Sequence, residues 1–332
     1  MSKPRVAFLN TGGTIARLGA DALDVIDYGI QRQSLEAAEL LARFPEATRD
    51  AEVYPVQFRS VPSSEIGFAD WKDLAVRLQR LAREDPELAG IVVAHGTASM
   101  EETAYFLHLT LGIEIPVVLV GAQRPPSALS SDAGMNLVGA VRVAADARAR
   151  GLGVLVVMND EIHSAREVTK TSTLRVNTFA SPDFGMLGQV DGDRVVFLRR
   201  PVAAFPLEAP FDLQAIEALP RVDIAYSYVG CDGVAVRAFI AAGALGLVAA
   251  GFAPGVTSPA QTDALAEAAR AGIAVVQSSR VLSGRVPASI RGAEHGFIAA
   301  GNLNAQKARI LLALALTAIR ERGEIQRWFE RH

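Results

Sequence analysis

The strongest constraint on the fold is a repeated pattern of short apolar runs, each followed by small or polar residues and then by a longer helix-like stretch. The runs are VAFL at 6–9, GIVVA at 90–94, PVVLVG at 116–121 and GVLVVM at 153–158. They are apolar on both faces instead of alternating, which is typical of parallel strands buried between two helix layers. Helices are expected between them at 70–84, 99–111 and 132–149, the last with Asp132 as its N-cap. The pattern therefore predicts a sheet built from βαβ units.

A proline-rich interruption divides this pattern. Three prolines fall within residues 201–212, directly after VVFLRR, and favour a linker there. The βα pattern then resumes on a smaller scale and closes with a helix expected from Asn304 to Arg322. At 332 residues the chain also exceeds one ordinary core. We expect a large doubly wound α/β domain over 1–200 and a smaller α/β domain over 213–332.

Charge and cysteine content narrow the classes of partner. The 33 basic and 36 acidic residues are scattered and give a net charge of −3, which argues against nucleic acid or a membrane surface as a partner. The sequence contains neither an apolar run of about 18 residues nor the pattern of a signal peptide. The single cysteine, Cys231, excludes an internal disulfide and suits a reducing compartment. We expect a cytoplasmic protein that binds a small molecule or further copies of itself.

The first motif that could carry chemistry is Thr11-Gly12-Gly13-Thr14, directly after the first strand. In a doubly wound sheet the ligand crevice lies at the carboxyl ends of the strands. The glycines permit close backbone approach, and their amides could donate to an oxyanion. Thr14 would then be a candidate nucleophile. The alternative is a tight turn without chemistry.

Three further residues could help a hydroxyl nucleophile. Thr97 follows another strand end in HGT, although it could instead cap the helix that starts near Met100. Lys170 in REVTKT could act as a base in a partly buried cleft, or be a solvated loop lysine. Tyr28 lies in the loop after the first motif and could relay a proton, or simply pack.

Other kinds of site lack support in the sequence. There is no HExxH or GxSxG motif, and the five histidines are scattered. The glycine spacings of dinucleotide-binding and P-loop proteins are also missing. We therefore expect neither a metal ion, nor a cofactor, nor a Ser-His-Asp triad.

Taken together, the motifs resemble the bacterial-type asparaginase family of L-asparaginases and glutaminase-asparaginases. The matching stretches occur in the family's order and span nearly the whole chain. They are TGGTIA at 11–16, HGTASMEETAYFL at 95–107, PVVLVGAQRP at 116–125, VLVVMND at 154–160, REVTKT at 166–171, SSRV at 279–282 and GFIAAGNLNAQKARILL at 296–312.

The resemblance implies a two-domain α/β fold and a homotetramer built from close dimers, in which a neighbouring subunit completes each site. It also implies hydrolysis through an acyl-enzyme on a threonine. By position, Thr14 is the nucleophile and Tyr28 its loop partner, while Thr97 and Lys170 form the proton relay.

The resemblance also assigns substrate-binding positions. Ser63 falls on the serine that binds the substrate carboxylate, next to Ser64, and Gly13 lies beside the nucleophile. The residue after Thr97 is ordinarily an aspartate that contacts the α-amino group of the substrate. In this chain it is Ala98.

Further departures affect the same part of the substrate. Pro62 stands where an aspartate often precedes the paired serines, and GFAP ending at Pro254 replaces the family's GVGN. The acid expected after SSRV falls in a shortened stretch, with Glu294 the only acid nearby. Each change removes a group that would recognise an α-ammonium, at roughly 1.5–3 kcal/mol per charge-assisted hydrogen bond.

Four hypotheses follow. The first is a divergent hydrolase of the family acting on a small amide, imide, ester or lactone without a free α-ammonium; it accounts for both the retained and the changed residues. The second is a conventional L-asparaginase or glutaminase. The third is a non-catalytic binding protein or pseudoenzyme, and the fourth is an ordinary enzyme inactivated by an engineered change at Ala98.

Overall fold

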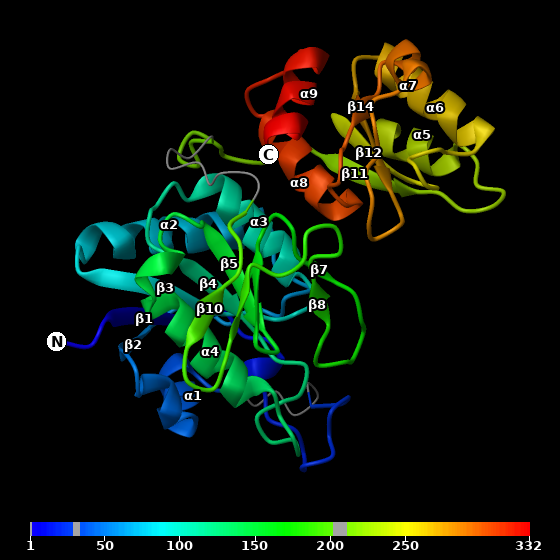
Figure 1. Ribbon diagram of the computed structural model, residues 1–332. Helices are drawn as coiled ribbons and strands as arrows, with labels where there is room; N and C mark the ends of the chain where they lie inside the picture. Colours follow the sequence, from blue (N-terminus) through cyan, green and yellow to red (C-terminus); the bar gives the residue numbers. More distant parts are fainter. Residues whose placement is uncertain (1, 29–33, 202–210) are drawn as a thin grey trace. The chain divides into compact units, whose positions relative to one another are not determined.

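A computed structural model describes residues 2–28, 34–201 and 211–332 (Figure 1). The chain divides into two compact units, Met1–Pro210 and Phe211–His332. Most of the expected linker 201–212 lies outside the described residues, so its ends stay a prediction. Within the part of the chain that is described, no helix is both long and apolar enough to cross a bilayer.

The N-terminal unit contains an eight-stranded mixed sheet in the order β10-β9-β6-β5-β4-β3-β1-β2. From β2 to β5 all neighbouring strands are parallel, and the pairs from β5 to β10 are antiparallel. The four predicted strands are confirmed as β1, β3, β4 and β5, whereas the antiparallel strands were not anticipated. The strands are β1 (Arg5–Asn10), β2 (Glu52–Val56), β3 (Leu88–Ala94), β4 (Val117–Val120), β5 (Val154–Met158), β6 (Glu161–Ser164), β9 (Gly188–Val190) and β10 (Val195–Phe197).

Helices cover both faces of this sheet, as the apolar strands predict (Figure 1). Helices α1 and α4 lie on one face, and α2 and α3 on the other. The helices are α1 (Ala37–Arg43), α2 (Phe68–Glu84), α3 (Met100–Thr110) and α4 (Ala133–Ala145). Short 3₁₀ turns add to them at Thr14–Ala16, Pro45–Thr48 and Ala147–Ala149.

The helix expected over 132–149 is shorter than predicted. It ends at Ala145, and a separate 3₁₀ turn follows. Asp132 occupies the N-cap position but makes no capping hydrogen bond with its side chain. Its carboxylate instead accepts hydrogen bonds from the backbone N–H groups of Gln123 and Arg124, 2.9 Å being the shortest distance to each. It therefore holds the loop after β4 and does not cap its own helix.

A separate two-stranded hairpin carries one of the predicted site residues. Strand β7 (Thr169–Lys170) pairs antiparallel with β8 (Phe179–Ala180). The N–H of Thr171 also donates to the carbonyl of Thr178 at 2.7 Å. Lys170 is thus part of a hydrogen-bonded ladder and not of a solvated loop.

The C-terminal unit is a smaller parallel α/β layer with strands in the order β11-β12-β13-β14. Helices α5 and α6 share an apolar cluster with the sheet, and α8 packs on β11, β12 and β13. Its elements are β11 (Val222–Tyr226), α5 (Val234–Ala241), β12 (Gly246–Gly251), α6 (Pro259–Arg270), β13 (Ala274–Ser279), α7 (Ile290–His295), β14 (Ile298–Ala299), α8 (Ala305–Ala315) and α9 (Arg322–Arg331).

The single closing helix predicted from Asn304 to Arg322 is wrong in its extent. Asn304 does cap α8, because its side-chain oxygen accepts from the N–H of Lys307 at 3.0 Å. The helix ends at Ala315, however, and α9 begins at Arg322. The carboxylate of Glu321 accepts from the first N–H groups of α9 and so starts a new helix.

Candidate active site

The turns after two neighbouring parallel strands touch at the carboxyl edge of the large sheet. Asn10, the last residue of β1, is in register with Ala94, the last of β3. Just beyond, a Cβ atom on Gly13 would lie 2.3 Å from the Cα of Gly96, and Gly13 has a φ of +94°. Only glycine permits both the contact and this backbone conformation. Because Thr14 follows Gly13 and Thr97 follows Gly96, the contact places the two threonine backbones next to each other.

Thr14 is paired with Tyr28. Thr14 begins the 3₁₀ turn, whose next two residues, Ile15 and Ala16, are buried and hold it in place. Its Oγ1 lies 2.7 Å from the hydroxyl of Tyr28, and either oxygen can be the donor. Both residues are half-buried. The predicted nucleophile and its loop partner are therefore in direct contact, and a proton can pass between them.

Thr97 is paired with Lys170. The Nζ atom of Lys170 donates to Oγ1 of Thr97 at 2.8 Å, across 73 positions of sequence. The alternative that Thr97 caps α3 is not supported, because Ser99 holds the N-cap position. Partial burial lowers the pKa of Lys170, and the carboxylate of Glu101 acts in the opposite direction. A lysine with a lowered pKa spends more time as the neutral amine that can accept a proton.

Two of the predicted substrate-binding residues, Gly13 and Ser63, lie against the turn at Gly96. A Cβ atom on Gly96 would lie 2.4 Å from Oγ of Ser63, so the Ser63 hydroxyl lies against this glycine. The carbonyl of Ser63 accepts from the hydroxyl of Ser99 at 2.6 Å. Ser64 and Ala98 are exposed. Ala98 therefore presents a methyl group to the solvent immediately beside Thr97.

His95 stabilises the turn that precedes Thr97. Its Nδ1 lies 2.8 Å from the carbonyl oxygen of Gly96, so the ring carries its proton on Nδ1. The side chain is fully buried, and burial lowers the pKa of His95 to about 4. The imidazole is therefore neutral near pH 7 and braces the Gly96 turn without adding charge to the site.

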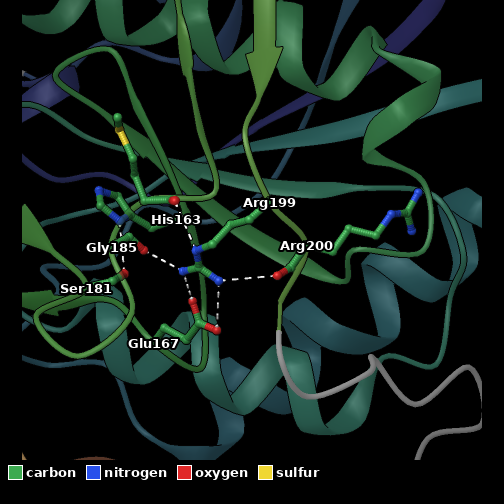
Figure 2. Close-up of polar contacts among 7 residues, drawn as sticks. His163, Glu167, Ser181, Gly185, Arg199 and Arg200 are labelled. Carbon is green, nitrogen blue, oxygen red and sulfur yellow. Dashed lines mark hydrogen bonds and ion pairs between the residues drawn. The ribbon is translucent and has the colours of Figure 1, made fainter.

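A cluster of polar groups that the sequence did not reveal fixes the segment before Lys170 (Figure 2). The guanidinium of Arg199 binds both carboxylate oxygens of Glu167, the shorter distance being 2.5 Å. It also donates to the backbone carbonyls of Gly185, Met186 and Arg200. Arg199 therefore ties together the segments before β7, before β9 and after β10.

Glu101 is the second residue that motif reasoning missed. Its carboxylate oxygen accepts from the backbone N–H of Lys170 at 3.2 Å. The only signal in the sequence was its place in the first turn of a buried helix, where an acid needs a partner. A carboxylate four residues after Thr97 thus reaches the lysine that contacts Thr97.

Of the remaining departures, Pro62 lies in the N-terminal unit, and the others lie in the C-terminal unit. Pro254 lies in the loop after β12, and Glu294 is exposed on α7. A cavity of about 380 Å³ in this unit is lined by Pro254, Gln277 and Arg291, among others, and by none of the predicted catalytic residues. Across the described parts of both units, no three His, Cys, Asp or Glu side chains are grouped to hold a metal ion.

Comparison with known proteins shows the family of the chain. Residues 5–203 match the family model described as asparaginase, N-terminal, and residues 221–329 match the model of the glutaminase/asparaginase C-terminal domain.

Full-length relatives and a solved structure are also similar. The chain is 40% identical to the probable periplasmic L-asparaginase of Haemophilus influenzae, covering 98% of this chain and 93% of the relative. It is 38% identical to L-asparaginase 2 of Escherichia coli, covering 100% and 94%. The glutaminase-asparaginase of Pseudomonas fluorescens is 38% identical, with 98% and 89% covered.

The crystal structure of a probable cytoplasmic L-asparaginase from Campylobacter jejuni superimposes with a TM-score of 0.94 at 40% identity, covering 99% of this chain and 100% of that one. Two family models, close relatives over the full length and a shared fold lead to one conclusion: the chain belongs to the bacterial-type asparaginase family of hydrolases.

Proposed function

We propose that this protein hydrolyses the side-chain amide of L-asparagine or L-glutamine through an acyl-enzyme on Thr14. The observation that carries the proposal is an arrangement of two hydrogen-bonded pairs, Thr14 with Tyr28 and Thr97 with Lys170. The two threonines lie on turns that touch where Gly13 meets Gly96. The relatives are named as L-asparaginases and glutaminase-asparaginases, which supports this hypothesis over the substrate without an α-ammonium.

The first half of the proposed reaction forms the ester. Thr14 Oγ1 attacks the amide carbon, and the bond from that carbon to nitrogen breaks. The proton of Thr14 passes through Tyr28, 2.7 Å away, to the leaving nitrogen, which departs as ammonia. The N–H of Gly13 is a candidate donor to the developing oxyanion, whereas the N–H of Gly12 is already bound by the side chain of Asn10.

The second half returns the enzyme to its starting state. The neutral amine of Lys170, acting through Thr97, takes a proton from an attacking water molecule. The carbon–oxygen bond of the ester then breaks, and the product leaves as a carboxylic acid. The proton held by Lys170 passes back through Thr97 to the leaving oxygen of Thr14, so the hydroxyl and the neutral amine are both restored. This step requires Lys170 to be neutral, which its lowered pKa favours.

A second candidate is hydrolysis of an amide, imide, ester or lactone that lacks a free α-ammonium. One observation favours it: residue 98 is an exposed alanine beside Thr97 and offers no acceptor for an ammonium group. Both candidate functions use the same two hydrogen-bonded pairs. The two differ only in which substrate the pocket prefers.

Ammonia release from millimolar L-asparagine and L-glutamine separates the candidates. We expect turnover that is lost by at least about a thousandfold in Thr14→Ala, since removing a nucleophile costs factors of this order or larger. Turnover of succinamate, which is asparagine without its α-amino group, in preference to both amino acids would favour the second candidate. Full activity in Thr14→Ala would contradict both.

We propose the cytoplasm as the compartment and a homotetramer as the assembly. The Campylobacter structure carries the name of a cytoplasmic enzyme, whereas the Haemophilus relative is named periplasmic. Fractionation of cells that express the untagged chain would distinguish the two compartments.

A further inference from the structure

One short stretch of chain binds both the side-chain amine and the backbone N–H of Lys170. The amine of Lys170 donates to Oγ1 of Thr97 at 2.8 Å, and its backbone N–H donates to the carboxylate of Glu101 at 3.2 Å. Thr97 and Glu101 are four residues apart, at the start of α3. The side chain of Glu101 lies within the protein, with the residue only 7% exposed. A buried carboxylate therefore accepts a hydrogen bond from the backbone of the lysine that contacts Thr97.

The charges around Lys170 leave Glu101 as the carboxylate that acts on it. The charged residues on its own segment are Arg166 and Glu167, and Glu167 is neutralised by Arg199. Strand β8, which pairs with β7, carries no charged residue. Among the described residues, Glu101 alone exerts a charge effect on the pKa of Lys170, raising it while burial lowers it. Ala98, on the same stretch as Glu101, supplies no charge.

We propose that Glu101 is a positioning residue for the reaction, one that anchors the backbone of Lys170 with its amine against Thr97 and balances the charge of the ammonium form. The inference rests on the proposed role of Lys170 as the base. Glu101 touches neither the substrate nor the reacting oxygens in this scheme. It acts by fixing where the amine lies and at what pH the amine becomes available.

Two substitutions separate anchoring from charge. Glu101→Gln keeps an oxygen acceptor for the Lys170 N–H but removes the negative charge. Glu101→Asp keeps the charge but shortens the reach by one methylene. Glu102→Gln is the matched control, because it removes the same charge from the neighbouring position of the same helical turn.

The pKa of Lys170 can be measured without catalysis, from the pH dependence of amine acylation at this residue followed by mass spectrometry. We expect Glu101→Gln to lower this pKa by about one unit or more, since a nearby opposite charge shifts a pKa by about 1–3 units. The acidic limb of kcat should move to lower pH by the same amount, because Lys170 acts in deacylation in this scheme and its neutral amine then exists at lower pH. Glu102→Gln should leave both values unchanged.

An unaltered Lys170 pKa in Glu101→Gln overturns the charge role. Glu101→Asp tests the anchor: its Lys170 pKa should stay near the wild-type value, while kcat and KM fall together by about tenfold. Both fall because Lys170 acts in deacylation, and small misplacements of catalytic groups are costly. Wild-type kcat in Glu101→Asp overturns the anchoring role, and this variant carries the test if Glu101→Gln does not fold. A wild-type protein that is inactive on every amide would refute the proposed function. The Lys170 pKa from the acylation measurement would still show whether Glu101 acts on this lysine.

Discussion

Two glycines determine how closely the candidate nucleophile approaches the relay. Gly13 and Gly96 are in backbone contact, and any side chain on Gly13 would overlap Gly96. The neutral ring of His95 braces the second of these turns through the Gly96 carbonyl. The geometry of this candidate site therefore depends on residues that take no part in the proposed chemistry, which agrees with the principle that enzymes preorganise their functional groups.

Ala98 is the residue at which specificity is best tested. We expect Ala98→Asp to raise kcat/KM for L-asparagine by roughly 10- to 100-fold, because a charge-assisted hydrogen bond contributes about 1.5–3 kcal/mol. Succinamate, which has no ammonium, should gain nothing. The ratio of the two kcat/KM values measures the effect and is independent of how much active enzyme is present.

We do not expect Ala98→Asp alone to reach the activity of an ordinary family member, since Pro254 and the shortened loop after SSRV remain. Full activity from this single change would contradict the interpretation that several positions act together. An equal gain for succinamate would contradict recognition of the ammonium by residue 98.

At the scale of elements, the position of Lys170 depends on hydrogen bonds that join its strand to other segments of the chain. The hairpin of β7 and β8 supplies the backbone ladder, and Glu167, three residues before Lys170, is held by Arg199 (Figure 2). The Glu167 side chain is 2% exposed, and that of Arg199 is 25% exposed. A carboxylate this deeply buried is stable only while its partner is present.

We therefore expect Arg199→Met to lower the free energy of unfolding by about 3–5 kcal/mol, the range for breaking a buried pair from one side. The double variant Arg199→Met with Glu167→Met should recover much of that loss, because no uncompensated charge remains. Denaturant melts of the two single variants and the double variant measure this. Equal losses in Arg199→Met and the double variant would show that the carbonyl contacts of Arg199, and not its charge, matter most.

At the scale of the whole molecule, every predicted catalytic residue comes from the N-terminal unit. The departure at Pro254 and the shortened stretch that contains Glu294 lie in the C-terminal unit. The resemblance to the family implies that residues of the C-terminal unit complete the site of a neighbouring subunit. The C-terminal unit of one subunit would then influence the substrate specificity of the site in the neighbouring subunit, and would do so only when the subunits are assembled.

We expect the purified protein to have a mass in solution four times the 35.2 kDa of one chain. Light scattering coupled to size-exclusion chromatography measures this directly. Dilution to the point of dissociation should reduce activity in parallel, because incomplete sites lose substrate contacts. A monomer with undiminished kcat/KM would contradict a site completed by a second subunit.

Sequence patterns anticipated much of the fold and the reactive groups. The parallel strands β1, β3, β4 and β5 were evident because strands buried on both faces are apolar throughout, and the cap at Asn304 was evident from its residue type. The parallel strand β2 was missed because it is partly exposed and not apolar throughout. The antiparallel strands β6, β9 and β10 were missed because each is only three or four residues long. The break between α8 and α9 was missed because apolar spacing continues across it, whereas Glu321 caps a new helix.

The sequence by itself determined which chemistry is available, because Thr14, Tyr28, Thr97 and Lys170 stand in motifs whose residue types and order are specific. The family resemblance already paired Thr14 with Tyr28 and Thr97 with Lys170, but only the tertiary structure supplied the contacts within each pair and the residues that support them. Lys170 meets Thr97 across 73 positions, and Glu167 meets Arg199 across 32. Local patterns carry no information about such contacts, since these arise from strand order, from the packing of turns and from the need of buried charges for partners.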